Sequence, residues 1–379
     1  MPRKKKVKAE DIKGSSSNQL NELLNQYSDD HHNFKEDVYY KVSTGSLILD
    51  IRTGGGIMPG LHRFCGINEG GKTSEALEVV KNMLKDIDDS KGIYVKSEGR
   101  LDPEMEKRTG IKFVKSAEEW EVGTCFVLEC NVYETVFKIV KALISDNPEQ
   151  IRYGIIIDSV DSLIPKGDLE KDLDEATKVA GGALLASKIM QRISLDMCKG
   201  GHIMILISQV RSDIQLDPYA KKAFKNTTAT GGNALMHYAN FIFEFEGRYN
   251  KDLILEKPNE RYDPIKNKIL GHEAKITIKK SPNEKTNTII CYPVRYGGKG
   301  GNSVWKEREI RDLMFENGLL IKSGAWVTVG PDVIEQMKDI GLEIPEKFQG
   351  RDSILEFMKE NEKFVEYWYN KFKEVYIES

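Results

Sequence analysis

Residues 66–73 read Gly-Ile-Asn-Glu-Gly-Gly-Lys-Thr and fit the pattern GxxxxGK[ST] in full. An apolar run, Leu61 to Gly66, precedes the motif, and apolar residues at helical spacing follow it, from Ala76 to Ile87. In this strand–turn–helix context, glycine-rich turns aim backbone N–H groups and a helix N-terminus at phosphate groups. The stretch therefore predicts a phosphate-binding loop in an α/β fold.

The chemistry of the loop predicts ATP and Mg²⁺ as its cofactors. Lys72 would neutralise the β- and γ-phosphate oxygens, and the Thr73 hydroxyl would hold the metal ion. We expect the whole loop and its flank to contact the nucleotide: Gly66, Ile67, Asn68, Glu69, Gly70, Gly71, Lys72, Thr73 and Ser74.

Two further carboxylates follow apolar strands. The run Tyr153 to Asp158 predicts a strand that carries Asp158 at its carboxyl end, where open α/β sheets bind ligands. Ser159 would lie next to it at the nucleotide site, and Asp158 would be a second Mg²⁺ ligand. Its alternative is a helix N-cap. The run ending at Lys96 brings Glu98 to the same edge, and Glu98 is predicted to orient the water that attacks the phosphate. The alternative for Glu98 is an ordinary surface carboxylate.

Strand and helix patterns alternate along most of the chain. Apolar runs at Leu61–Gly66, Gly92–Lys96, Gly154–Asp158 and His202–Ser208 are separated by helical patterns, which predicts a mostly parallel central sheet flanked by helices. The sequence becomes strand-rich after about residue 238. Residues 331–379 hold seven Lys/Arg and twelve Asp/Glu, and predict a small acidic helical C-terminal domain.

Composition limits the classes of protein that remain. The chain has 379 residues, a formal net charge of -3 and no run of about 20 apolar residues, so we expect no membrane span and only local contacts to nucleic acid. Five cysteines without CxxC spacing predict a reducing, intracellular compartment.

The N-terminal segment, residues 1–40, is predicted to be a flexible basic tip and a short helix. Leu20, Leu23, Leu24 and Tyr27 lie at helical spacing and would form its apolar stripe. Residues 41–328 would form the ATPase core and residues 329–379 the C-terminal domain.

Six further segments resemble, in order, the RecA family of strand-exchange recombinases, which includes bacterial RecA and phage proteins of the UvsX type. They are STGSLILD (43–50), EGRLDP (98–103), IDSV (157–160), LISQVR (206–211), TATGGNAL (228–235) and GLLIKSGAW (318–326). The resemblance implies a P-loop ATPase core of RecA type and a protein that polymerises on single-stranded DNA and pairs it with a matching duplex.

The resemblance also implies roles for individual residues. Glu98 and Lys72 would be catalytic, Asp102 would contact the nucleotide, and Gln209 would sense the γ-phosphate. Lys279 and Lys280 stand near a lysine pair that reaches the nucleotide of a neighbouring subunit. The helix around Leu20–Tyr27 would pack on the adjacent protomer of a helical filament, and its alternative is a helix folded back on its own core.

Two segments match the family's DNA-binding loops, about 165–182 and 210–230. The second is followed by a glycine pair, and its basic side chains can meet phosphates while an aromatic ring stacks on bases. The candidate DNA contacts are Arg211, Lys221, Lys222, Phe224, Lys225, Gly231, Gly232 and Asn233. A solvated surface loop is the alternative. The acidic first loop gives a weaker indication of DNA contact.

The expected partners are single- and double-stranded DNA, further copies of the chain, and single-strand-binding and loader proteins. Two rival functions remain: an accessory or mediator ATPase that binds DNA without strand exchange, and a ring-forming helicase motor.

Substitutions in the second predicted DNA-binding loop, about residues 210–230, test whether it binds DNA. We expect Phe224→Ala and Lys225→Ala to weaken single-strand binding without unfolding the protein, because each removes a stacking or phosphate contact. Titration of a labelled oligonucleotide at several salt concentrations measures the effect, and Lys225→Ala should also flatten the salt dependence. Unchanged affinity in both variants would contradict the assignment.

Overall fold

The computed structural model describes residues 9–28, 33, 38–99, 101–169, 181–211, 228–229, 232–258, 260–283, 286–301 and 303–378. The chain divides into two units, Met1–Tyr39 and Tyr40–Ser379. The first unit contains helix α1 (Ala9–Gln26), on which Leu20 and Leu23 are exposed, as is Tyr27 just beyond it. The predicted N-terminal helix is therefore present and displays its apolar residues.

The second unit is built on an eleven-stranded sheet whose main path runs β11-β10-β8-β1-β6-β5-β2-β4-β3. From β8 to β3 all strands on this path are parallel, and β10 and β11 extend the sheet antiparallel. The strands are β1 (Gly60–Gly66), β2 (Ser90–Lys96), β3 (Phe113–Val114), β4 (Cys125–Glu129), β5 (Arg152–Asp158), β6 (Ile203–Arg211), β7 (Thr228–Ala229), β8 (Phe241–Phe245), β9 (Leu253–Leu255), β10 (Ile269–Lys280) and β11 (Thr288–Arg295). The expectation of a mostly parallel sheet is confirmed.

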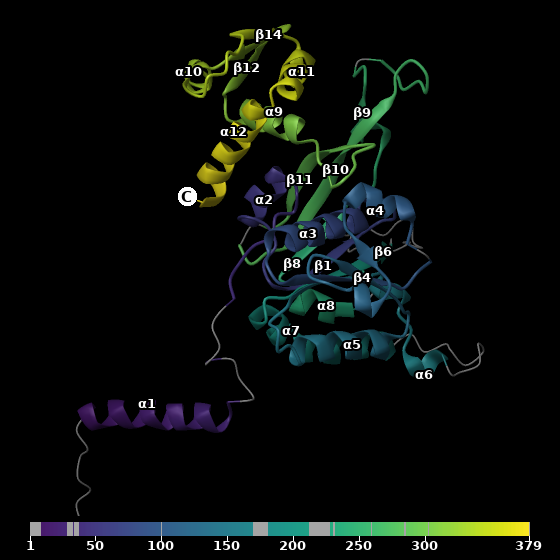
Figure 1. The fold of residues 1–379 in the computed structure, drawn as a ribbon, viewed down its shortest axis with the longest axis vertical. Coiled ribbons are helices and arrows are strands. Elements are labelled where there is room, and N and C mark those ends of the chain that lie inside the picture. The colour runs from purple at the N-terminus through teal and green to yellow at the C-terminus, as the bar shows by residue number, and fades with distance from the viewer. Residues whose placement is uncertain are drawn as a thin grey trace, which may run out of the picture. The chain divides into compact units, whose positions relative to one another are not determined.

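Helices cover both faces of this sheet (Figure 1). On one face, α3 packs Val80 and Met83 into a core shared with β1, β8 and β10. On the other face, α5 and α7 contribute Val140 and Met190 to a second core. The helices of this part are α2 (Leu47–Thr53), α3 (Lys72–Asp86), α4 (Pro103–Thr109), α5 (Tyr133–Ser145), α6 (Lys166–Leu169), α7 (Gly181–Lys199) and α8 (Gly232–Tyr238).

The C-terminal part combines helices with a small sheet. Helices α9 (Lys306–Glu316), α10 (Pro331–Asp339), α11 (Arg351–Glu360) and α12 (Glu362–Lys373) surround an antiparallel sheet of β12 (Leu320–Ser323), β13 (Trp326–Val329) and β14 (Lys347–Gln349). The helices after residue 329 were expected, whereas α9 and the sheet were not. Val327 and Val329 alternate inward from β13 and join a core that also includes Leu47 of α2 and Ile310 of α9, both before the predicted boundary at residue 329.

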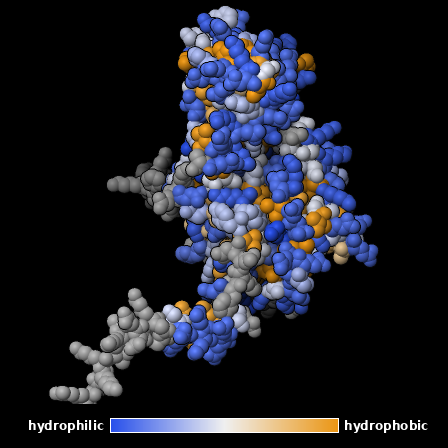
Figure 2. All heavy atoms as spheres, turned by 60° about the vertical axis from the view of Figure 1, so that its left-hand side comes forward, coloured by the Kyte–Doolittle hydropathy of each residue, from blue (hydrophilic) through white to orange (hydrophobic). Residues whose placement is uncertain are grey.

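The surface is mostly hydrophilic on the face drawn in Figure 2, where hydrophobic side chains form separate patches. Within the described ranges, none of the helices combines the length and the apolar character needed to span a bilayer.

The packing of β1 against β8 gives a test of the fold. Phe64 is fully buried and stacks on Phe243 with ring centroids 5.1 Å apart, so we expect Phe64→Ala to destabilise the protein by about 3–5 kcal/mol. Urea unfolding measures this loss. Ile289→Ala on β11 is the control, because Ile289 is 61% exposed. An equal loss in both variants would contradict the core assignment.

Candidate nucleotide site

The P-loop leaves β1 and enters α3 through two glycines with left-handed backbone. Gly66 has φ +145, and a Cβ there would lie 2.3 Å from the carbonyl oxygen of Phe245 on β8. Gly71, with φ +99, is the residue before the first turn of α3. The glycines are required because the loop passes close to β8 and then reverses into the helix.

Lys72 points back onto the loop that it follows. Its ammonium group donates to the carbonyl oxygens of Gly66 and Ile67, at 3.0 and 2.6 Å, and only 7% of the residue is exposed. Burial lowers the pKa of Lys72, and the negative charge of Asp158 opposes that shift. The cation is therefore held at the loop, next to the backbone that would cradle an anion.

Asp158 and Thr73 lie together at the edge of the sheet. The Thr73 hydroxyl donates to Asp158 Oδ2 at 3.0 Å, and the Tyr94 hydroxyl donates to the same oxygen at 2.8 Å. Burial and the Asp158 charge raise the pKa of Tyr94, which keeps it a donor. Asp158 caps no helix here, since Ser159 occupies the position before the short turn Val160–Ser162. The Asp158–Ser159 peptide bond is cis.

This pair of oxygen ligands suits a magnesium ion. Hydroxyl and carboxylate oxygens are hard donors, and Mg²⁺ in phosphate sites takes one or two protein ligands while phosphates and waters supply the rest. Among the residues that the structure describes, no three His, Cys, Asp or Glu side chains gather as a metal site. Thr73 and Asp158 thus fit the ion only in company with a nucleotide.

Glu98 follows β2 and is tied to the strand that carries Asp158. The Ser159 hydroxyl donates to Glu98 Oε1 at 2.8 Å. The Ser97 hydroxyl donates to the carbonyl oxygens of Asp158 and Ser159, each at 2.9 Å. The structure therefore brings Glu98 beside Asp158, as expected, and Ser97 is a supporting residue that the sequence analysis missed.

Gln209 lies opposite Gly66 in the parallel pairing of β6 with β1. Its backbone N–H donates to Asp161 Oδ2 at 2.6 Å. Beyond it, β6 reaches Arg211 and pairs with β7 through Arg211 and Thr228. The predicted second loop thus leaves from the strand that carries Gln209.

Several predicted DNA contacts lie outside the described residues. They are Lys221, Lys222, Phe224, Lys225 and Gly231, together with residues 170–180 of the first loop. Gly232 and Asn233 open α8, and of the first loop the structure describes α6 and the start of α7. The DNA roles of these segments stay predictions.

The two lysines near the end of β10 make contacts within the chain. Lys279 pairs with Glu244 of β8 at 2.8 Å, and Lys280 donates to the carbonyl oxygens of Met236 and His237 at the end of α8. Asp102 accepts from the backbone of Glu104 at 2.9 Å and caps α4. None of these contacts tests a role at a subunit interface or at the nucleotide.

A cavity of about 250 Å³ adjoins the P-loop, and the sequence analysis did not predict it. Arg108 of α4 reaches across to Ser74 Oγ at 3.2 Å on one side. The other side is formed by the end of β11 and the turn after it. The lining includes Gly70, Gly71, Ser74, Glu75, Arg108, His272, Tyr292, Tyr296, Gly297 and Gly298. The aromatic–glycine–glycine turn at 296–298 was the local signal that could have indicated it.

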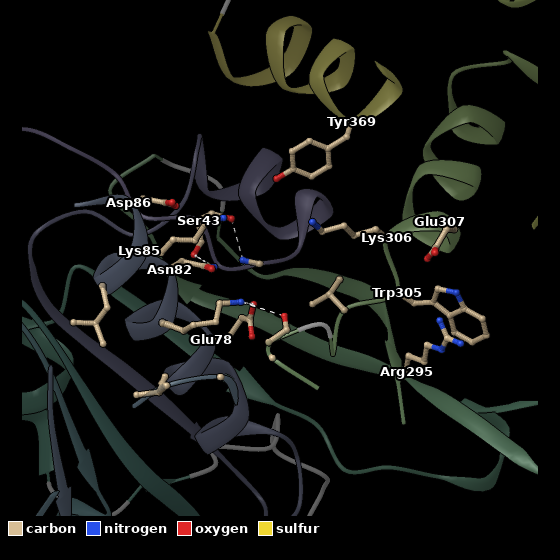
Figure 3. A pocket seen from close by; sticks show the side chains of 18 of the residues that line it. Ser43, Glu78, Asn82, Lys85, Asp86, Arg295, Trp305, Lys306, Glu307 and Tyr369 are labelled. Carbon is tan, nitrogen blue, oxygen red and sulfur yellow. Dashed lines mark hydrogen bonds and ion pairs between the residues drawn. The ribbon is translucent and has the colours of Figure 1, made fainter. Parts of the chain in front are cut away.

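A larger cavity of about 780 Å³ lies between α3, the segment before α9, and α12 (Figure 3). Glu78 and Lys81 form an ion pair at its wall. Lys306 lies over the Tyr369 ring, 5.6 Å from its centroid, and Arg295 lies 5.5 Å from the centroid of Trp305. Much of the charge around this cavity is therefore already matched within the protein.

Comparison of the sequence with known proteins identifies a matching family and several relatives. Residues 29–282 match the model of the RecA N-terminal domain family. The RecA protein of Nostoc sp. (strain PCC 7120 / SAG 25.82 / UTEX 2576) is 26% identical over 326 residues, 86% of this chain and 78% of the relative. The RecA protein of Limosilactobacillus reuteri (strain DSM 20016) is 28% identical over 307 residues, which are 79% of this chain and 73% of the relative. These relatives are bacterial RecA proteins, and the matches do not support a phage origin or the UvsX type.

Proposed function

The chain belongs to the RecA family, and from this premise we propose that it is an ATP-dependent homologous-recombination protein. It forms filaments on single-stranded DNA, pairs that strand with a homologous duplex and exchanges strands, with ATP hydrolysis stimulated by DNA. The observation that carries the proposal is the meeting of Lys72, Thr73, Asp158 and Glu98 at one edge of the sheet, joined by the Thr73–Asp158 and Ser159–Glu98 hydrogen bonds.

In this proposal each residue has one task in hydrolysis. The P-loop backbone and the α3 N-terminus bind the phosphates, and Lys72 exchanges its carbonyl partners for phosphate oxygens. Thr73 and Asp158 hold Mg²⁺, which supplies positive charge to the β- and γ-phosphates when it is bound. Glu98 orients a water toward the γ-phosphorus and takes its proton as the bond to ADP breaks.

The strand β6 offers a physical link between nucleotide and DNA. Gln209 sits beside Gly66, and the same strand runs directly to Arg211, where the predicted DNA-binding loop begins. A γ-phosphate bound by Gln209 would bias the loop through that strand, and DNA bound at the loop would bias Gln209 in return, because coupling between two sites is reciprocal.

Filament formation is proposed to use two parts of the chain, helix α1 and the lysine pair at the end of β10. Helix α1, with its exposed Leu20 and Leu23, would bury that stripe on an adjacent copy. Lys279 and Lys280 would reach the neighbouring subunit's nucleotide, for which Lys279 must leave Glu244. Single-strand-binding and loader proteins would assist assembly.

Substitution of Glu98 separates binding from chemistry. We expect Glu98→Gln to slow phosphate release at least about 100-fold while ATP and single-stranded DNA stay bound, because only the proton acceptor is lost. Lys72→Ala should also lose turnover. Glu118→Gln is the control, since Glu118 is an exposed carboxylate in the short turn Ala117–Glu119 and is not one of the predicted site residues. Normal turnover in Glu98→Gln and Lys72→Ala would refute the site.

The proposed function is tested by phosphate release from purified protein with and without single-stranded DNA. We expect strong stimulation by DNA, because Gln209 and the loop share one strand. Electron microscopy of the same mixtures should show helical filaments. ATP turnover without stimulation would favour the mediator function, and closed rings would favour a helicase motor.

A further inference from the structure

Asp161 lies in the short turn that follows β5, three residues after Asp158. Its carboxylate oxygen Oδ2 accepts a hydrogen bond from the backbone N–H of Gln209 at 2.6 Å. The parallel pairing of β5 with β6 ends at the pair formed by Ile157 and Leu206, three residues before Gln209. The carboxylate therefore takes the place of a strand carbonyl as the acceptor at Gln209. Hydrogen bonds to an ionised acceptor are stronger than neutral ones.

The turn that carries Asp161, residues 159–162, also holds Glu98. The Ser159 hydroxyl donates to Glu98 Oε1 at 2.8 Å. The Ser162 hydroxyl donates to the carbonyl oxygen of Ser159 at 2.8 Å and closes the turn, and it is also hydrogen-bonded to the hydroxyl of Ser97. One short turn therefore contacts both the residue proposed to orient the water and the residue proposed to sense the γ-phosphate.

A buried arginine holds the same part of β6 from its other neighbouring strand. Strands β1 and β5 flank β6, and Arg63 of β1 is only 1% exposed. Arg63 Nε donates to the hydroxyl of Ser208, the residue before Gln209, at 3.0 Å. Burial lowers the pKa of Arg63, and the negative charge of Asp161 opposes that shift. A buried guanidinium group is costly without a compensating charge, and Asp161 supplies part of it.

Asp161 and Arg63 lie outside the segments on which the resemblance to the family rests. The segment IDSV ends at Val160, one residue before Asp161, and Arg63 precedes the P-loop motif by three residues. Asp161 is nevertheless close enough to the P-loop to act on it electrostatically. Burial lowers the pKa of Lys72, and the charges of Asp158 and Asp161 both oppose that shift. Asp161 thus belongs to the surroundings of the nucleotide site in this chain.

We propose that Asp161 is a positioning residue, which fixes the backbone of Gln209 to the turn that holds Glu98 and thereby places the Gln209 side chain at the γ-phosphate. This inference rests on the proposed function only in taking Gln209 as the γ-phosphate sensor of an ATP site. Arg63 supports the arrangement by holding Ser208 and by balancing the charge of Asp161.

The affinity for ATPγS relative to that for ADP tests the proposal, because only ATPγS presents a group at the γ-position. We expect Asp161→Ala to lower this ratio about tenfold, because a misplaced Gln209 side chain loses its hydrogen bond to a charged group. Both affinities are measured by competition against a fluorescent ADP analogue, with Mg²⁺ present. An unchanged ratio in Asp161→Ala, or equal affinities of the native protein for ATPγS and ADP, would overturn the proposal.

A double-mutant cycle shows whether Asp161 acts through Gln209. Gln209→Ala removes the side chain that would sense the γ-phosphate but keeps the backbone N–H that Asp161 accepts. The double variant with Asp161→Ala should have the same ratio as Gln209→Ala alone, because Asp161 then has no side chain to place. A further, additive fall of the ratio in the double variant would show that Asp161 acts on the nucleotide independently of Gln209, and would overturn the proposal.

Two further substitutions separate the hydrogen bond from the charge of Asp161. Asp161→Asn keeps a side-chain oxygen that can accept from Gln209, so it should retain most of the native ratio. A ratio as low as that of Asp161→Ala would assign the effect to the charge near Lys72 and overturn the proposal. If Asp161→Ala fails to fold, Asp161→Ser takes its place with the same expected loss, because its hydroxyl ends one bond short of the Gln209 N–H.

Asn147→Ala is the matched control for a purely structural loss. Asn147 Oδ1 accepts the backbone N–H of Ile151 at 3.0 Å, just before β5 begins at Arg152 and thus at the opposite end of the strand from Asp158. The substitution removes a side-chain acceptor of a backbone N–H, as Asp161→Ala does. We expect Asn147→Ala to leave the ratio of ATPγS to ADP affinity unchanged. An equal fall of the ratio in both variants would contradict a specific role of Asp161.

The outcomes distinguish the inference from the function it rests on. ATP hydrolysis stimulated by DNA in the native protein, together with an unchanged ratio in Asp161→Ala, would remove the role of Asp161 and leave the proposed function intact. A ratio that falls as expected, in a protein whose turnover DNA does not stimulate, would support the role of Asp161 and remove the recombination function. Absence of ATP binding by the native protein would remove both.

Discussion

The parallel pairing of β1, β6, β5 and β2 is the constraint on which the site depends. Because these strands run in one direction and in fixed register, their carboxyl ends meet at one edge. Gly66 lies opposite Gln209, and Lys96 lies opposite Asp158. Backbone hydrogen bonds therefore hold the segments that carry Lys72, Glu98 and Asp158 together before any side chain contributes. The hydroxyls of Tyr94 and Ser159 then donate to the carboxylates of Asp158 and Glu98, while Ser97 donates to the backbone carbonyl oxygens of Asp158 and Ser159.

Desolvation is the second constraint, and it acts differently on the two ionisable residues of the first turn of α3. Lys72 is buried but bonded to two carbonyl oxygens and near Asp158, so its ammonium group has compensating partners. Glu75 is buried with one donor only, and its neighbours Glu78, Asp50 and Glu309 add repulsion. Burial therefore raises the pKa of Glu75 to about 8.

Much of the architecture was predictable because its signals lie within short stretches of the sequence. Four-to-seven-residue apolar runs mark buried parallel strands, and the glycines of residues 66–73 indicate a loop whose backbone few other residues allow. The C-terminal sheet was harder, because β12, β13 and β14 have four, four and three residues, too few for alternation to show. Its inward residues belong to a core shared with helices that were recognised.

The sequence by itself indicated the P-loop motif, the mostly parallel sheet, and the position of Asp158 and Glu98 at one edge of that sheet. Only the tertiary structure decided which groups line the cavity beside the P-loop. Glu75, His272 and Tyr296 come from segments some 200 residues apart, and no local pattern links them. The raised pKa of Glu75 likewise depends on its burial in the folded protein, because a carboxyl group keeps its charge most readily where water or a cation stabilises it.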